Sequence, residues 1–121
     1  MDAADLLELF APIGPIRLKR MFSGHAVFAD DLCFALALRG EVYMKADAKT
    51  EDIFASAGSR QFTYEKAGRT VKVAYWLLPA DAFDDLDELR RWSELALAAA
   101  RRAGERKPVR KRSRRTAKSR R

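Results

Sequence analysis

The residues with the clearest chemical potential lie at the C-terminal end of the chain, where Lys and Arg dominate. Residues 101–121 contain twelve Lys or Arg side chains and one acid, Glu105. Cationic groups at this density bind phosphates, because each contact releases condensed counterions from the polyanion. The sequence therefore predicts a segment that binds nucleic acid and favours duplex DNA over RNA as the partner. The predicted binding residues are Arg106, Lys107, Arg110, Lys111, Arg112, Arg114, Arg115, Lys118, Arg120 and Arg121.

The rest of the chain has the opposite charge balance. Residues 1–100 carry twelve Lys or Arg and sixteen Asp or Glu, so the formal net charge of +7 arises from the C-terminal segment. A run such as 110–115 offers almost nothing to bury, and its like charges repel. We therefore expect a folded domain over residues 1–103 and a disordered basic tail over residues 104–121. The alternative to nucleic-acid binding is that the basic tail serves only to keep the protein soluble.

Candidate catalytic and metal-binding residues are scarce. His25 is the single histidine and Cys33 the single cysteine, so a pair of histidines cannot bind zinc. His25 and Cys33 would form a nucleophile pair if adjacent strands brought them together. However, Cys33 shares its predicted strand face with Ala35 and Ala37, which favours a small core residue. We expect no catalytic residues, no metal site and no cofactor, and hence a protein that is not an enzyme.

Two further features of the sequence have both a functional and a structural interpretation. The acids between residues 81 and 88 lack the spacing of a calcium loop and fit better as caps and solvent-facing residues of the last helix. Aromatic residues alternate with cations in the predicted strands and could stack on bases: Phe22, Phe28, Tyr43, Phe62, Tyr64, Tyr75 and Trp76, with Lys45, Lys66, Arg69 and Lys72. Because the domain is net acidic, aromatics that cover their own core or a dimer contact are the favoured interpretation.

The elements that must position these residues follow from periodicity and turn signals. A first helix over residues 3–11 ends at Pro12. Short apolar or alternating runs separated by turns predict four strands, over residues 17–22, 25–29, 32–38 and 42–46. In the third run, Leu32, Phe34, Leu36 and Leu38 form one face of large residues. The connections are too short for crossover helices, so these strands form an antiparallel meander.

The second half of the domain repeats this mixture of helix and strand. Thr50 begins a short helix, and a hairpin follows with strands over residues 61–65 and 71–78. Asp85 and Glu88 have the spacing of a capping box for the last helix. The buried face of that helix is predicted to carry Leu86, Leu89, Trp92, Ala96, Leu97 and Ala100.

Together these elements predict an α+β fold, in which three helices flank an antiparallel β-sheet of about five to six strands. The chain contains no apolar stretch of the ~20 residues that a membrane span needs, so we expect no membrane partner. The first residues are acidic, unlike a signal peptide, and one cysteine fits a reducing compartment. We therefore expect a bacterial protein of the cytoplasm. Association with the nucleoid is compatible with this expectation.

Five segments together resemble the N-terminal domain of the TfoX/Sxy family. They span about residues 5–100 and are Arg20–Phe28, Phe34–Leu36, Val42–Asp47, Phe62–Tyr64 and Tyr75–Pro79. Their order and spacing are specific, although Ser23 and Ala26 stand where the family pattern has glycines. A turn that needs positive φ at those positions would have to be built differently here. In longer members a second, helical domain follows, whereas here the basic segment takes its place.

The resemblance implies a non-enzymatic role in transcription. Longer members of the family resemble co-activators that act with the cyclic-AMP receptor protein at competence promoters. The leading hypothesis is a DNA-associated regulatory or accessory protein, whose folded domain contacts a transcription-factor partner or a second copy. The alternatives are a protein-interaction module or small homodimeric adaptor with an incidental tail, and an RNA-associated factor whose arginine-rich segment folds on RNA.

Overall fold

The computed structural model describes residues 2–21 and 24–111, with side chains described as far as Gly104. Six strands form one antiparallel sheet in the spatial order β1-β2-β3-β4-β6-β5. Their bounds are β1 (Arg17–Met21), β2 (Gly24–Ala29), β3 (Leu32–Leu38), β4 (Glu41–Lys45), β5 (Gln61–Lys66) and β6 (Arg69–Leu77). The predicted meander and hairpin are confirmed, and the pairing of β4 with β6 joins them into one sheet.

Tight turns explain why the strands are antiparallel. The two-residue connections at 30–31, 39–40 and 67–68 have φ between 52° and 79° at both positions. Positive φ at both central residues is the type I′ geometry, whose twist matches that of the strands it joins. Each of these turns therefore directs the chain straight back along the preceding strand.

Three α-helices and two short 3-10 helices complete the fold: α1 (Ala3–Phe10), η1 (Ala11–Ile13), α2 (Glu51–Ser56), η2 (Ala80–Phe83) and α3 (Leu86–Lys111). The predicted α+β class with three helices is therefore confirmed. The carboxylate of Asp85 caps α3 by accepting the amide protons of Asp87 and Glu88. The Glu88 carboxylate does not complete the predicted capping box. Instead it accepts a hydrogen bond from the indole nitrogen of Trp92.

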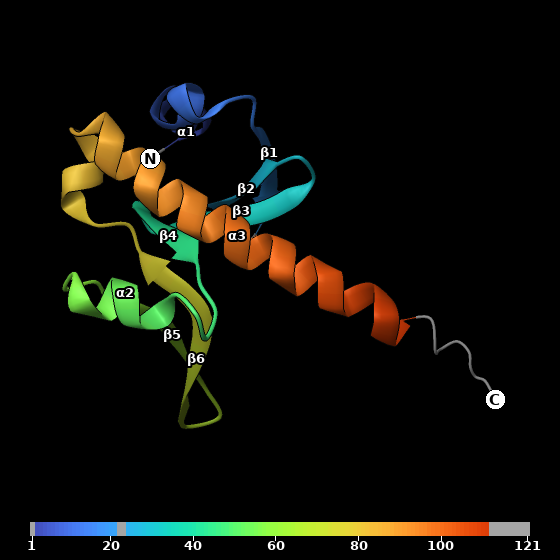
Figure 1. The fold of residues 1–121 in the computed structure, drawn as a ribbon. Coiled ribbons are helices and arrows are strands. Elements are labelled where there is room, and N and C mark those ends of the chain that lie inside the picture. The colour runs from blue at the N-terminus through green and yellow to red at the C-terminus, as the bar shows by residue number, and fades with distance from the viewer. Residues whose placement is uncertain (1, 22–23, 112–121) are drawn as a thin grey trace.

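The core lies between the helices and one face of the sheet. Trp92 of α3 packs against Phe54 of α2, with ring centroids 4.7 Å apart. Phe10 of α1 meets Phe34 of β3 edge to face at 5.3 Å. Figure 1 shows α3 crossing the strands diagonally and continuing beyond the edge of the sheet. Among the described helices, none has both the length and the apolar character needed to cross a membrane.

Strand β3 contains a bulge that the alternation pattern did not predict. Val27 pairs with Ala35 whereas Phe28 pairs with Cys33, so one step along β2 corresponds to two steps along β3. The additional residue, Phe34, and its neighbour Ala35 are both fully buried. The prediction of a single large-residue face along β3 is therefore wrong, because a bulge reverses the alternation of side chains at that point.

Helix α3 extends past the predicted domain boundary. The boundary lies after residue 103, whereas the helix continues to Lys111 and so includes residues 104–111. Lys, Arg and Glu favour a helix, whereas Gly104 and Pro108 in the same stretch disfavour one, so intrinsic propensity alone does not explain why the helix continues. Residues 112–121 of the predicted disordered tail lie outside the described residues.

Candidate functional site

The residues predicted to bind nucleic acid begin just after the last described side chain. Arg106, Lys107, Arg110 and Lys111 fall within the C-terminal turns of α3, where the structure describes the backbone. The other six lie outside the described residues: Arg112, Arg114, Arg115, Lys118, Arg120 and Arg121. In Figure 1, α3 carries the start of this basic segment away from the sheet.

An ion pair fixes the direction in which α3 leaves the domain. The guanidinium of Arg102 donates to both carboxylate oxygens of Asp47, at 2.6 Å from Nε and 2.9 Å from Nη2. Asp47 follows β4 directly and also accepts the amide proton of Lys49 and the hydroxyl proton of Thr50. The hydrogen bond from Arg102 lowers the pKa of Asp47, although burial acts in the opposite direction. The pair therefore ties the sheet to the helix that continues into the basic segment.

The face of the sheet that points away from the helices carries a group of apolar and aromatic side chains. Ala35 and Met44 are paired and face the core, so the next pair, Leu36 and Tyr43, faces the other way. A groove with a volume of about 520 Å³ lies on this side, lined by Met21, Leu36, Leu38, Arg39, Phe62, Tyr64 and Val73. We call this surface the open face. Grouped apolar side chains of this kind are typical of interaction surfaces.

Tyr43 is held in place on the open face by polar and aromatic contacts. Its ring meets that of Phe62 at a centroid distance of 4.9 Å and an angle of 63°. Its hydroxyl donates to Glu41 at 3.0 Å, and Arg60 donates to the same carboxylate oxygen at 2.9 Å. Burial and the hydrogen bond to Glu41 raise the pKa of Tyr43, so the phenol stays neutral at physiological pH. The side chain is thus a fixed, uncharged part of the surface.

Cys33, Lys45 and Tyr75 form a second group on the open face. The Cys33 thiol lies 3.7 Å from the Tyr75 hydroxyl, and the Lys45 ammonium lies 5.2 Å from the centroid of the Tyr75 ring. Burial, with a smaller effect from Cys33, raises the pKa of Tyr75. Cys33 is partly exposed. The prediction that it shares a buried face with Ala35 and Ala37 is therefore wrong, because the β3 bulge separates them.

The structure separates the aromatic residues that the sequence pattern groups together. Trp76 faces the helices and lies 6.3 Å from Phe54, ring centroid to centroid. Phe28 lies beneath the guanidinium of Arg17 at 4.7 Å. The open face retains Tyr43, Phe62, Tyr64 and Tyr75, while Phe22 lies outside the described residues. Phe28 of β2 pairs with Cys33 and so lies on the same side of the sheet. The described aromatic residues of the open face are therefore spread from β2 to β5 and are not gathered in one platform.

The cations of that hypothetical platform are also dispersed. Lys66 and Arg69 are paired at the tip of the β5–β6 hairpin, and Lys72 pairs with Thr63, one residue away from the Tyr64–Val71 pair on the open face. Neighbouring residues of a strand point to opposite faces, so Lys72 points away from Tyr64. Of these four cations, Lys45 alone lies over an aromatic ring of the open face within the described residues, that of Tyr75. The sequence-based picture of cations interleaved with a row of aromatic residues is therefore not reproduced on this face.

The register of the sheet separates the two residues that could have formed a nucleophile pair. His25 pairs with Ala37 whereas Cys33 pairs with Phe28, which places them about three residues, or roughly 10 Å, apart along the strands. Among residues 2–21 and 24–104, no group of three or more His, Cys, Asp or Glu side chains is arranged to hold a metal ion.

Gly24 is a glycine that the structure requires, within the segment Arg20–Phe28 that resembles the family pattern. A Cβ atom at this position would lie 1.8 Å from the backbone oxygen of Ala37, so β2 could not begin this close to β3 with any other residue. Ala26 is an ordinary strand residue of β2 without positive φ, so this position needs no glycine. Ser23 lies outside the described residues.

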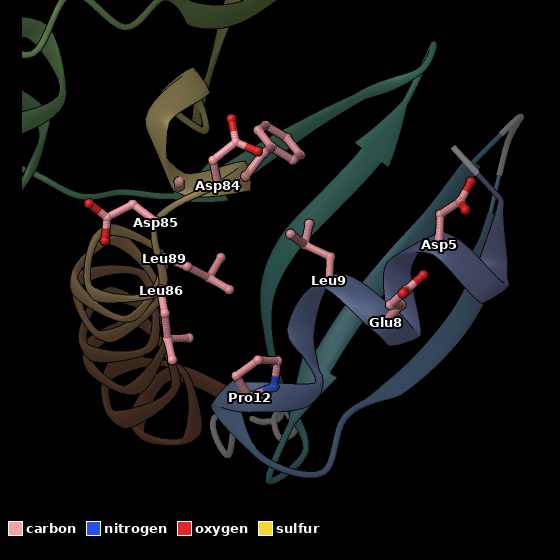
Figure 2. Close-up of a pocket in the computed structure, with 10 residues that line it drawn as sticks. Asp5, Glu8, Leu9, Pro12, Asp84, Asp85, Leu86 and Leu89 are labelled. Carbon is pink, nitrogen blue, oxygen red and sulfur yellow. The ribbon is translucent and has the colours of Figure 1, made fainter.

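A second hollow lies on the helical side, between α1, η2 and the start of α3. Figure 2 shows Leu9, Pro12, Leu86 and Leu89 facing this hollow, with acidic side chains around it. Its volume is about 530 Å³, and its acidic residues are Asp5, Glu8, Asp84 and Asp85. We call it the acidic groove. Leu86 is 43% exposed there, so its predicted place on the buried face of the last helix is wrong: as the first residue of α3 it lies beside the groove.

The groove and the Asp47–Arg102 pair were both missed by the sequence analysis. Asp84 and Asp85 stand next to Phe83 and Leu86, so a local signal of exposed apolar and acidic residues was present in the sequence. The two other acids, Asp5 and Glu8, come from α1, about eighty residues earlier, and no local pattern joins them to this site.

Comparison with known proteins places this fold in a family. Residues 8–100 match the family model described as the TfoX N-terminal domain. The chain is also similar to Protein Sxy of Escherichia coli (strain K12), with 28% identity over 93 residues. That alignment covers 77% of this chain and 44% of the relative, so the chain spans less than half the length of Protein Sxy.

Proposed function

This chain belongs to the family of the TfoX N-terminal domain, and from that premise we propose that it is a non-enzymatic regulatory or accessory protein of transcription that associates with DNA. Its basic segment, from Arg106 onward, holds the protein on the phosphate backbone. Its folded domain contacts a transcription-factor partner or a second copy. The protein acts in the bacterial cytoplasm, in association with the nucleoid.

The observation that supports this proposal is the division of charge along the chain. Residues 101–121 carry twelve cations and one acid, whereas residues 1–100 carry an excess of four acids. An acidic body is repelled by a phosphate backbone, so affinity for DNA must come from the basic segment. Contacts from Lys and Arg to phosphate position a protein but do not read bases. The expected binding therefore has little sequence preference.

The open face supports the protein-contacting part of the proposal. It offers the groove lined by Leu36, Leu38, Phe62 and Val73, with Tyr43 fixed beside it. Tyr64 at its margin is 41% exposed. Specificity for a promoter would then come from the partner, because phosphate contacts from the basic segment position the protein without reading bases. A co-activator-like role of the kind that the family resemblance implies fits this arrangement.

Charge removal tests the DNA-binding part. Replacing Arg110, Lys111, Arg114 and Arg115 by Gln in the full chain should weaken binding to a duplex at low salt by at least tenfold, because four phosphate contacts are lost. A matched control replaces four cations of the folded domain by Gln: Arg17, Lys66, Arg69 and Lys72. Fluorescence anisotropy with a labelled duplex measures both. If the control loses as much affinity as the first variant, DNA lies on the folded domain and the proposal is wrong.

The open face also favours a second candidate function, a small homodimeric adaptor whose basic segment is incidental. An apolar groove centred on a sheet is typical of a self-association surface. Tyr64→Glu places a charge on this face, while Thr63→Glu places the same charge on the other side of β5. If the adaptor reading is right, sedimentation shows a dimer that Tyr64→Glu dissociates and Thr63→Glu does not. A monomer at all concentrations would exclude it.

A further inference from the structure

We propose that the acidic groove binds the basic segment, residues 104–121, of a second copy of this chain. The proposed contact is intermolecular and polar at its rim, and it is separate from the open face. It makes the groove a competitor of nucleic acid for the same cations.

The chemistry of the groove fits Lys and Arg side chains. Such side chains cover apolar surface with their methylene stems and keep the charged head at a polar margin. The groove provides both parts: Leu9, Leu86 and Leu89 in its wall, and Asp5, Glu8 and Asp84 among its lining, whereas the carboxylate of Asp85 points away from these leucines in Figure 2. The groove is therefore complementary in charge to the one strongly cationic stretch of the sequence.

Two of the four carboxylates are available for pairing. Asp5 and Asp85 accept amide protons at the starts of α1 and α3, and they keep their negative charge while doing so. The side chains of Glu8 and Asp84 make no hydrogen bond or ion pair with any residue whose side chain the structure describes. A cation that enters the groove can therefore pair with Glu8 and Asp84 without breaking an existing interaction.

The direction of α3 makes the contact one between copies. The groove lies at the N-terminal end of this helix, beside Leu86 and Leu89, whereas the basic segment is at its other end. A helix of 26 residues is about 39 Å long. Figure 1 shows α3 pointing away from the body at its C-terminal end. The Asp47–Arg102 ion pair holds this direction, so α3 carries the start of the basic segment away from the groove of its own molecule.

This geometry has a consequence for regulation that rests on the proposed DNA binding. A contact of one end of a molecule with the other end of its neighbour is heterologous and can continue from copy to copy. Duplex DNA at high charge density competes for the same Lys and Arg side chains. The protein therefore associates with itself in the absence of nucleic acid and separates into DNA-bound copies in its presence.

A peptide titration tests the groove directly. A fluorescein-labelled peptide with the sequence of residues 104–121 is titrated at low salt with the full chain, with Glu8→Gln/Asp84→Asn, and with the control Asp52→Asn/Glu94→Gln. Asp52 and Glu94 are exposed and lie away from the groove, so the control removes the same charge elsewhere. We expect saturable binding that the groove variant weakens about fivefold or more and the control changes less than twofold.

Equal weakening by the two variants would overturn the proposal, since it would show attraction to the acidic body as a whole. Absence of saturable binding to the wild-type chain would overturn it too. Circular dichroism of both variants establishes that they are folded. Duplex binding by the full chain is measured separately. If the full chain does not bind DNA, the peptide titration still tests whether the groove binds the basic segment. The groove variant should bind duplex DNA at least as tightly as wild type, because its groove no longer competes for the basic segments of other copies.

Discussion

At the scale of single residues, the contact between Arg102 and Asp47 fixes the direction of α3 where it leaves the domain. Arg102 is the last described cation before the predicted DNA-binding residues, and its bidentate contact with Asp47 joins α3 to the end of β4. Bidentate contacts between a guanidinium and a carboxylate fix geometry as well as adding free energy. Because both side chains remain partly exposed, the stabilisation is modest, and its main effect is on the direction of the helix.

Asp47→Asn should lower the free energy of unfolding by about 1 kcal/mol at pH 7, because the amide cannot replace the charged, bidentate acceptor. The folded state holds the pKa of Asp47 below its ordinary value. The contribution of Asp47 is therefore present above the unfolded-state pKa and is lost as the pH falls through the folded-state pKa. Urea unfolding at pH 7 and at low pH measures it. The gap between wild type and variant should close in acid. A gap that persists unchanged would rule out the ion pair as its cause.

A single substitution at Ala67, in the β5–β6 turn, should stabilise the protein. This residue has φ of 52° in the β5–β6 turn, a conformation that costs an alanine about 1 kcal/mol and suits Asn better. Ala67→Asn should therefore raise the free energy of unfolding by about 0.5–1 kcal/mol in urea titrations. The same change at Ala74, in the body of β6, serves as the control and should not stabilise. A neutral or destabilising result for Ala67→Asn would argue against the type I′ turn.

At the scale of elements, the function depends on one long helix packed across one face of one sheet. The core joins Trp92 and Ala96 of α3 to Phe54 of α2 and to Val42 and Met44 of β4. This packing leaves the other face of the sheet open and places the acidic groove and the basic segment at opposite ends of α3. Three surfaces with different chemistry thus arise from the position of a single element.

Trp92→Ala tests how strongly α3 is held. The side chain is 1% exposed and packs on Phe54, so its removal should cost about 3–5 kcal/mol. Leu86→Ala is the comparison within the same helix and should cost less than about 1 kcal/mol, because Leu86 is 43% exposed. Denaturant unfolding of both variants provides the measurement. A loss under 1 kcal/mol for Trp92→Ala would mean that α3 is not part of the core.

Local signals explain how much of this arrangement could be predicted. Turn residues such as Arg39-Gly40 and the alternation along the strands act over a few residues, so strands and turns followed from the sequence. The β3 bulge could not be predicted, because it depends on how β2 aligns with β3. The Asp47–Arg102 pair joins residues 55 positions apart, and the acidic groove joins α1 to α3. Such sites are formed by packing and leave no periodic pattern.

At the scale of the whole molecule, the separation of charge is the feature that the proposed function needs. An acidic body with an open apolar face suits a protein partner, and a cationic segment suits a polyanion. In the proposed function, α3 joins the two, so that the molecule would hold a partner near DNA without reading the base sequence itself. The acidic groove adds a competitor for the cationic segment when DNA is absent.

A salt series on the full chain tests the central claim most directly. Fluorescence anisotropy with a labelled duplex, at salt concentrations from about 50 to 200 mM, gives the slope of log affinity against log salt. If five or six cations of the basic segment contact phosphates at once, the slope should be about −5. Arg114→Ala/Arg115→Ala should flatten it by up to about two units and leave the preference among duplex sequences unchanged. A slope near zero, or one that this double substitution leaves unaltered, would contradict DNA association through the basic segment.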